Sequence, residues 1–94
     1  MATTILAAGT TAATSSDIIL AVGESATLFL TGAAGVSAPD AAACEVQFKR
    51  ADNTYVPVYN MRGLGNLNTA RVDGPVTLRV SRSAGSANFG VDRV

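Results

Sequence analysis

The 94-residue sequence contains no histidine and no tryptophan, and it has a single cysteine and a single lysine. Without histidine, neither a Ser–His–Asp nor a Cys–His arrangement for nucleophilic catalysis can be assembled. The lone cysteine, Cys44, forms no internal disulfide and builds no zinc site. No run reaches the ~18 consecutive apolar residues that a membrane-spanning helix needs. These absences predict a protein that is not an enzyme, carries no metal or cofactor and does not enter a membrane.

Basic residues are missing from the first half of the chain. Residues 1–48 hold four acidic residues and no lysine or arginine, whereas residues 49–94 hold all seven basic residues against three aspartates. The formal net charge is zero. Free nucleic acid is therefore not expected as a partner, because no excess positive charge is present to displace its counterions. The same split would allow an acidic surface of one molecule to dock on a basic surface of another.

The length of 94 residues fits one small domain. Such a domain buries only about two-thirds of the surface that its unfolded chain exposes, so its stability margin is small. Since disulfides and metals are excluded, association is the remaining source of extra stability. We therefore expect an oligomer or a docked subunit, and a self-sufficient monomer with a well-packed core is the alternative.

Short apolar or alternating segments, separated by Gly, Pro, Asn and Asp, predict about seven or eight strands and no long helix. We expect strands at residues 18–22, 26–31, 44–49, 55–59, 67–72, 76–81 and 87–91. Their spacing of about ten residues predicts an all-β, antiparallel sandwich or barrel, jelly-roll-like, over residues 17–94. Residues 23–25 have the length of a hairpin connection. In the third strand Cys44, Val46 and Phe48 are expected to face the core.

Residues 1–16 are nearly all Ala, Thr, Ser and Gly, and Ile5 and Leu6 are the bulky side chains after Met1. This composition predicts either a thin edge strand or an extended arm that is mobile until a partner holds it. In the second case, deleting residues 2–16 would weaken binding to that partner more than folding. The segment lacks the basic start and long apolar core of a secretion signal, so we expect assembly in a cytoplasm.

Six of the seven basic residues are arginine, a side chain that is enriched at protein interfaces. The candidates for a basic docking face are Arg62, Arg71, Arg79 and Arg82. Such a face would bind an acidic partner surface. The alternative is pairing within the chain, with Asp17, Glu24 or Glu45 as the partner.

Tyr55 and Tyr59 are expected to share one face of their strand, with Pro57 between them. Pro57 has no N–H to donate, which predicts that this strand lies at the edge of a sheet. The two tyrosines would form a binding platform for a sugar or a peptide. The alternative is a partly buried edge with hydrated hydroxyls.

Two strings carry a resemblance to a known class of proteins. They are FKRADNTYVPV at residues 48–58 and DGPVTLRVSRSAG at residues 73–85, the latter followed by GVDR at residues 90–93. With the Ala/Thr-rich opening, they resemble small β-sandwich decoration or cement proteins of tailed-bacteriophage capsids. The resemblance implies many copies, bound as dimers or trimers at junctions between major capsid subunits in the virion, with no catalytic residues. The alternatives are a head-fibre base or tail component, and a carbohydrate-binding module that uses the two tyrosines.

Overall fold

Nine β-strands and no helix make up the residues described by the computed structural model, which are 2–33, 36–64, 67–85 and 87–94. Over these ranges no helix is long and apolar enough to cross a membrane. The strands are β1 (Thr3–Gly9), β2 (Ala13–Thr14), β3 (Ile18–Leu20), β4 (Ser25–Thr31), β5 (Ala43–Lys49), β6 (Tyr55–Arg62), β7 (Thr69–Asp73), β8 (Val76–Arg82) and β9 (Phe89–Arg93). Met1 lies outside the described residues.

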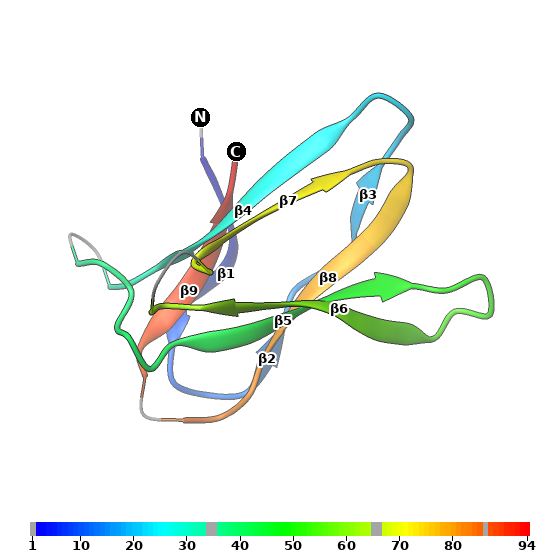
Figure 1. Ribbon diagram of the computed structural model, residues 1–94. Coiled ribbons are helices and arrows are strands. Elements are labelled where there is room, and N and C mark those ends of the chain that lie inside the picture. The colour runs from blue at the N-terminus through cyan, green and yellow to red at the C-terminus, as the bar shows by residue number, and fades with distance from the viewer. Residues whose placement is uncertain (1, 34–35, 65–66, 86) are drawn as a thin grey trace.

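The strands form two antiparallel sheets that face each other (Figure 1). Sheet A has the order β1-β9-β4-β7, and sheet B has the order β2-β8-β5-β6, with β3 also paired to β8. The chain passes repeatedly between the sheets, since β1, β4, β7 and β9 belong to one and the remaining strands to the other. The prediction of an all-β antiparallel sandwich is confirmed.

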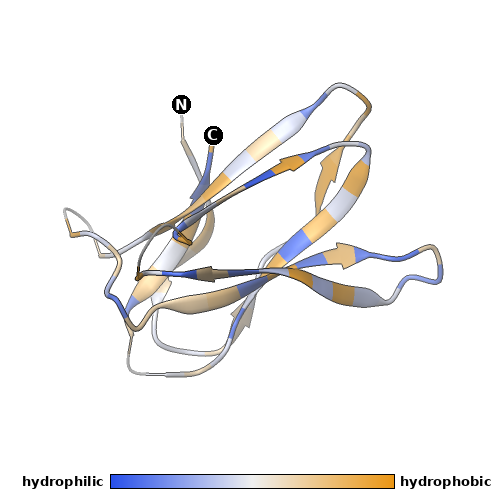
Figure 2. Ribbon diagram, viewed as in Figure 1, coloured by the Kyte–Doolittle hydropathy of each residue, from blue (hydrophilic) through white to orange (hydrophobic). Residues whose placement is uncertain are grey.

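Alternation along each strand places one set of side chains between the sheets. In β8, Leu78 and Val80 are fully buried, whereas Thr77 and Arg79 between them are partly exposed. Figure 2 shows the same alternation as apolar and polar bands along β8. The other buried apolar side chains are Leu6, Ile18, Leu20, Ala26, Leu28, Leu30, Ala42, Cys44, Val46, Met61, Val72, Phe89 and Val91. These side chains form one continuous core between the two sheets.

The connection expected as a hairpin at residues 23–25 joins the two sheets instead. β3 pairs with β8 in sheet B, whereas β4 pairs with β7 and β9 in sheet A. The turn is closed by a backbone hydrogen bond from Glu24 to Ala21 (3.0 Å) and by a carboxylate oxygen of Glu24, which accepts from the Ala21 N–H (2.6 Å). Gly23 takes the left-handed conformation, φ 84°, that favours glycine. A tight turn therefore does not identify a hairpin unless its two strands also pair.

The connection between β5 and β6 is a true hairpin. Asp52 accepts hydrogen bonds from both the backbone N–H and the hydroxyl of Thr54, at 3.1 and 2.6 Å. β6 lies at the edge of sheet B, as Pro57 predicts. A bulge interrupts the hairpin, because Val46 pairs with Tyr59 and the next residue, Gln47, pairs with Pro57. This bulge determines which way the side chains of β6 point.

The N-terminal segment supplies an edge strand to each sheet. β1 pairs with β9, and Leu6 is buried in the core. β2 pairs with the end of β8. Between β2 and β3, Ser15 continues the ladder by donating its N–H to Val80 O (2.8 Å) and accepting the Val80 N–H on Oγ (2.9 Å). Because the segment contributes to both sheets, deleting residues 2–16 is expected to weaken folding directly.

The two ends of the sandwich have different connections (Figure 1). One end, which we call the loop end, is formed by residues 10–12, 32–42, 63–68 and 83–88, to the extent that they are described. The other, the turn end, is formed by the short connections at residues 21–24, 50–54 and 74–75, together with both termini. Only the loop end contains connections longer than five residues.

Candidate protein-binding surfaces

The outer face of sheet B carries a network of polar side chains around Tyr55. The Tyr55 hydroxyl donates a hydrogen bond to Asp17 Oδ1 (2.7 Å), across the sheet from its own strand. Asp17 Oδ2 lies 3.5 Å from Lys49 Nζ. Arg79 lies on the face of the Tyr55 ring, with its Cζ 3.5 Å from the ring centroid. An aromatic ring, a carboxylate and two cations are thus assembled from four separate segments of the chain.

The network continues along the strands through amide and carboxylate groups. Arg79 Nε donates to Gln47 Oε1 (2.8 Å), and Gln47 Nε2 donates to Glu45 Oε1 (3.0 Å). The hydrogen bond from Tyr55 lowers the pKa of the Asp17 carboxyl, and the charge of Lys49 acts in the same direction. The same hydrogen bond raises the pKa of the Tyr55 hydroxyl, because ionisation would remove its proton. The guanidinium of Arg79 is therefore engaged within the chain.

Arg82 is buried at 5% exposure and cannot belong to an exposed docking face. Its Nε donates to Thr11 O (2.8 Å), and its Nη1 donates to Ala7 O (2.9 Å) and Phe89 O (2.5 Å). These bonds tie β8 of sheet B to β1 and β9 of sheet A. The alternation of β8 places Arg82 on the inner face with Leu78 and Val80, a parity that the sequence analysis overlooked.

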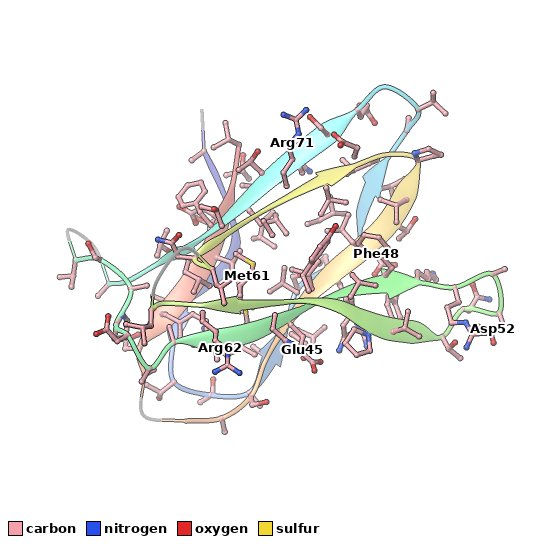
Figure 3. The ribbon with its side chains drawn as sticks, viewed as in Figure 1. Glu45, Phe48, Asp52, Met61, Arg62 and Arg71 are labelled. Atoms are coloured by element: carbon pink, nitrogen blue, oxygen red, sulfur yellow. The ribbon has the colours of Figure 1, made fainter. Side chains whose placement is uncertain are left out.

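Arg62 and Arg71 point away from the molecule on opposite sides of the sandwich (Figure 3). Arg71 belongs to β7 of sheet A, and its Nε lies 3.3 Å from Asp73 Oδ1 in an exposed ion pair. Arg62 ends β6 of sheet B and is exposed. Together with the internal contacts of Arg79 and the burial of Arg82, this distribution corrects the expectation of one basic face.

Tyr55 and Tyr59 lie on opposite faces of β6, which corrects the expectation of a shared platform. Across the ladder Tyr59 is paired with the buried Val46, and its ring meets Phe48 edge-on, with centroids 6.1 Å apart and planes at 77°. Phe48 points into the space between the two sheets (Figure 3). The bulge adds one residue to β6 between the two tyrosines, so the alternation reverses there.

Ile5 and Leu6, the apolar candidates in the N-terminal segment, differ in accessibility. Leu6 belongs to the core, whereas Ile5 is half-buried and lines a groove between β1 and β3 with the exposed Ile19 and Val94. Only Ile5 of the two is available to a partner without opening the sandwich. This groove lies beside the charged groups Asp17 and Arg93.

The connecting segments of the loop end carry almost no charge, a feature that was not predicted from the sequence. Asp40 is the single charged residue in its four connecting segments. Val36, Leu64 and Leu67 are all more than half exposed there. The backbone of the loops is held in place, since Ala42 donates to Pro39 O (3.0 Å) and Gly63 donates to Ala42 O (2.9 Å). The sequence already contained this feature, because these long connecting segments hold a single charged residue.

A groove runs from the outer face of sheet A to the loop end. Its described lining includes Phe29 and Asp92 on the sheet, Ala7 and Ala8 of β1, and Val36 and Asp40 of the loop. Phe29 points outward because Leu28 and Leu30 on either side of it point into the core. A side chain at Gly90 would meet the backbone of residues 6–8, so glycine is needed where β1 crosses β9. The groove contains two carboxylates and no basic residue among its described lining.

Chemically reactive groups are few in the part of the chain that the structure describes. No group of three or more metal-ligating side chains is found within it. Cys44 is buried, and this burial raises the pKa of its thiol to about 11, which keeps it protonated at neutral pH. Comparison of the chain with known protein families, curated proteins and solved structures finds no match.

Proposed function

We propose that this protein is a non-enzymatic structural component of a tailed-bacteriophage virion, a decoration protein that binds across major capsid subunits and stabilises the head. The strings at residues 48–58, 73–85 and 90–93 that carry the resemblance lie in the β5–β6 hairpin, around β8 and in β9 of the sandwich. Assembly on a particle would also supply the stabilisation that so small a domain is expected to need.

The observation that carries the docking role is the composition of the loop end. Its exposed apolar side chains can be buried against a protein surface without the desolvation of many charges, which is the costly part of forming an interface. The turn end is different, because its shorter connecting segments contain the charged residues Glu24, Arg50 and Asp52. We assign the loop end as the surface that contacts the capsid, and the major capsid protein as the partner.

The first experiment measures how many copies of the chain a purified particle contains, by quantitative mass spectrometry against the major capsid protein. Hundreds of copies per particle are expected for a decoration protein. A few copies would place the chain at a tail or a head-fibre base, and none would overturn the virion assignment. Glycan binding by the isolated chain would support the carbohydrate-binding alternative, which the opposite faces of Tyr55 and Tyr59 disfavour.

The second experiment tests the docking surface with matched variants. Val36→Ser with Leu64→Ser removes apolar side chains from the loop end, and Val22→Ser removes one from the turn end, where Val22 is 81% exposed. Recombinant chains are added to particles that lack the protein, and the bound copies are counted. Loss of binding with the loop-end variant and full binding with Val22→Ser are expected. Equal binding by both variants would contradict the assigned surface.

A further inference from the structure

The groove on the outer face of sheet A resembles an unfilled version of the network on sheet B. Phe29 and Asp92 are directly opposite each other on β4 and β9, so both side chains are on the same face. On sheet B, the aromatic ring of Tyr55 and the carboxylate of Asp17 are similarly adjacent, and Arg79 stacks on that ring. On sheet A, no described basic residue lines the groove.

The nearest basic residue on that face does not fill the gap. Arg71 lies on β7, beyond Phe29, and its guanidinium is directed to Asp73. Within the described ranges, neither Asp40 nor Asp92 takes part in an ion pair. A guanidinium is the cation best suited to such a groove, because it stacks on an aromatic ring while it pairs with a carboxylate.

The chain itself contains a suitable arginine at the loop end, the same end of the sandwich that the groove reaches. Arg62 is the last residue of β6, so it lies at the loop end, and it points away from the molecule on the outer side of sheet B (Figure 3). The groove opens on the outer side of sheet A and also reaches the loop end. Arg62 forms no ion pair with any described residue. When sheet B of one copy faces sheet A of another, Arg62 of the first copy can therefore lie opposite the groove of the second.

We propose that Arg62 of one molecule binds in the sheet A groove of a second copy of this chain, with its guanidinium between the Phe29 ring and the Asp92 carboxylate. The two contact surfaces differ, so the association is heterologous and gives a ring if the rotation closes or a filament if it does not. Because both surfaces lie near the loop end, neighbouring copies stand side by side with their loop ends directed to the same side. This contact goes beyond the proposed function, since it needs no capsid.

Sedimentation velocity of the purified chain over a range of concentrations tests the contact. The wild type is expected to associate above its 9.5 kDa monomer mass, and more weakly at high salt because the charges are screened. Asp92→Lys and Arg62→Glu are each expected to lower the association constant roughly tenfold or more, since each places like charges together. Exchanging the charges, with Asp92→Arg and Arg62→Asp in one chain, is expected to restore association.

Matched controls keep the test specific. Arg50→Glu makes the same charge change at an exposed arginine of the turn end and is expected to leave association unchanged. Circular dichroism verifies that each variant folds. A wild type that stays monomeric at millimolar concentration, or an exchanged pair that fails to associate, would overturn the contact. A monomeric chain that still binds particles would do so while leaving the proposed function intact.

Discussion

The outer faces of the two sheets differ in how their charges are satisfied. On sheet B, Tyr55 joins Asp17, Lys49 and Arg79 in one intramolecular network. On sheet A, Phe29 and Asp92 supply an aromatic ring and a carboxylate, without the phenolic hydroxyl, in an open groove with no described basic residue in its lining. An arginine-rich composition therefore does not by itself identify a binding face, because Arg79 and Arg82 are engaged within the chain.

The largest loss of stability is expected on replacing Arg82, the buried side chain that links the two sheets. Replacing Arg82 with Met leaves three backbone carbonyls without their donor and cuts the link between the sheets. Unsatisfied buried polar groups are costly, so we expect a loss of about 3 kcal/mol in the free energy of unfolding. Urea denaturation measures it. A loss within 0.5 kcal/mol, about the effect of an ordinary surface substitution, would show that water replaces the guanidinium.

A smaller change in Tm is expected from a matched pair of substitutions, one on the outer face of each sheet. Asp17→Asn weakens the bond that Tyr55 makes on sheet B, and Asp92→Asn changes a carboxylate that has no described ion-pair partner on sheet A. We expect a lower Tm for Asp17→Asn and an unchanged Tm for Asp92→Asn, measured at concentrations where the chain is monomeric. Equal changes in Tm would mean that the two faces do not differ in this way.

The Tyr55 network is expected to make stability depend on pH at both ends of the pH scale. Because the pKa of Asp17 is lowered from its usual 3.8, this carboxylate stabilises the fold above that value and ceases to do so as the pH falls through its lowered pKa. Because the pKa of Tyr55 is raised above 10.0, its contribution is complete below pH 10.0 and is lost as the pH rises through the raised value. Ultraviolet titration of Tyr55 in a Tyr59→Phe background is expected to show a lower pKa once Asp17→Asn is added. An unchanged titration would exclude the hydrogen bond.

The smallest effect is expected in the labelling rate of Cys44, which lies on the opposite side of sheet B from the Tyr55 network. Cys44 lies on the inner face of β5 and has a pKa of about 11, against 9.0 when unperturbed. Because the pKa is about two units higher, the thiolate fraction at pH 8 is roughly a hundredfold smaller than in the unfolded chain. Labelling by a thiol reagent is therefore expected to be roughly a hundredfold slower. Rapid labelling of the folded chain would indicate that the sheets separate readily. Asp92→Asn should leave this rate unchanged, since it disturbs neither the inner face nor the expected stability.

The fold could be predicted from the sequence because its strands are short and their alternation is regular. Val76, Leu78 and Val80 marked β8, and Pro57 marked an edge strand. The pairing of strands was harder to predict, because a turn such as residues 21–24 looks alike whether its strands pair or diverge. The requirement for glycine at position 90 was also hard to predict, because it arises only from the close approach of the β1 backbone.

The candidate residues were predicted less well than the fold. Arg82 lies on the inner face that its own strand's alternation indicates, so the pattern was available but was not extended to the end of β8. The opposite directions of Tyr55 and Tyr59 depend on a bulge, which strict alternation cannot reveal. The groove brings together Phe29 and Asp92, which are far apart in the sequence and meet only through the pairing of β4 with β9.

The most direct test of the contrast between the two faces is an intermolecular nuclear Overhauser measurement on a mixed sample. Half of the molecules carry labelled arginine and the other half carry labelled phenylalanine, so cross-peaks between the two labels arise only between copies. We expect cross-peaks between the side chain of Arg62 and the ring of Phe29, and none from Arg50. The absence of Arg62–Phe29 cross-peaks at millimolar concentration would contradict the claim that a second copy completes the sheet A face.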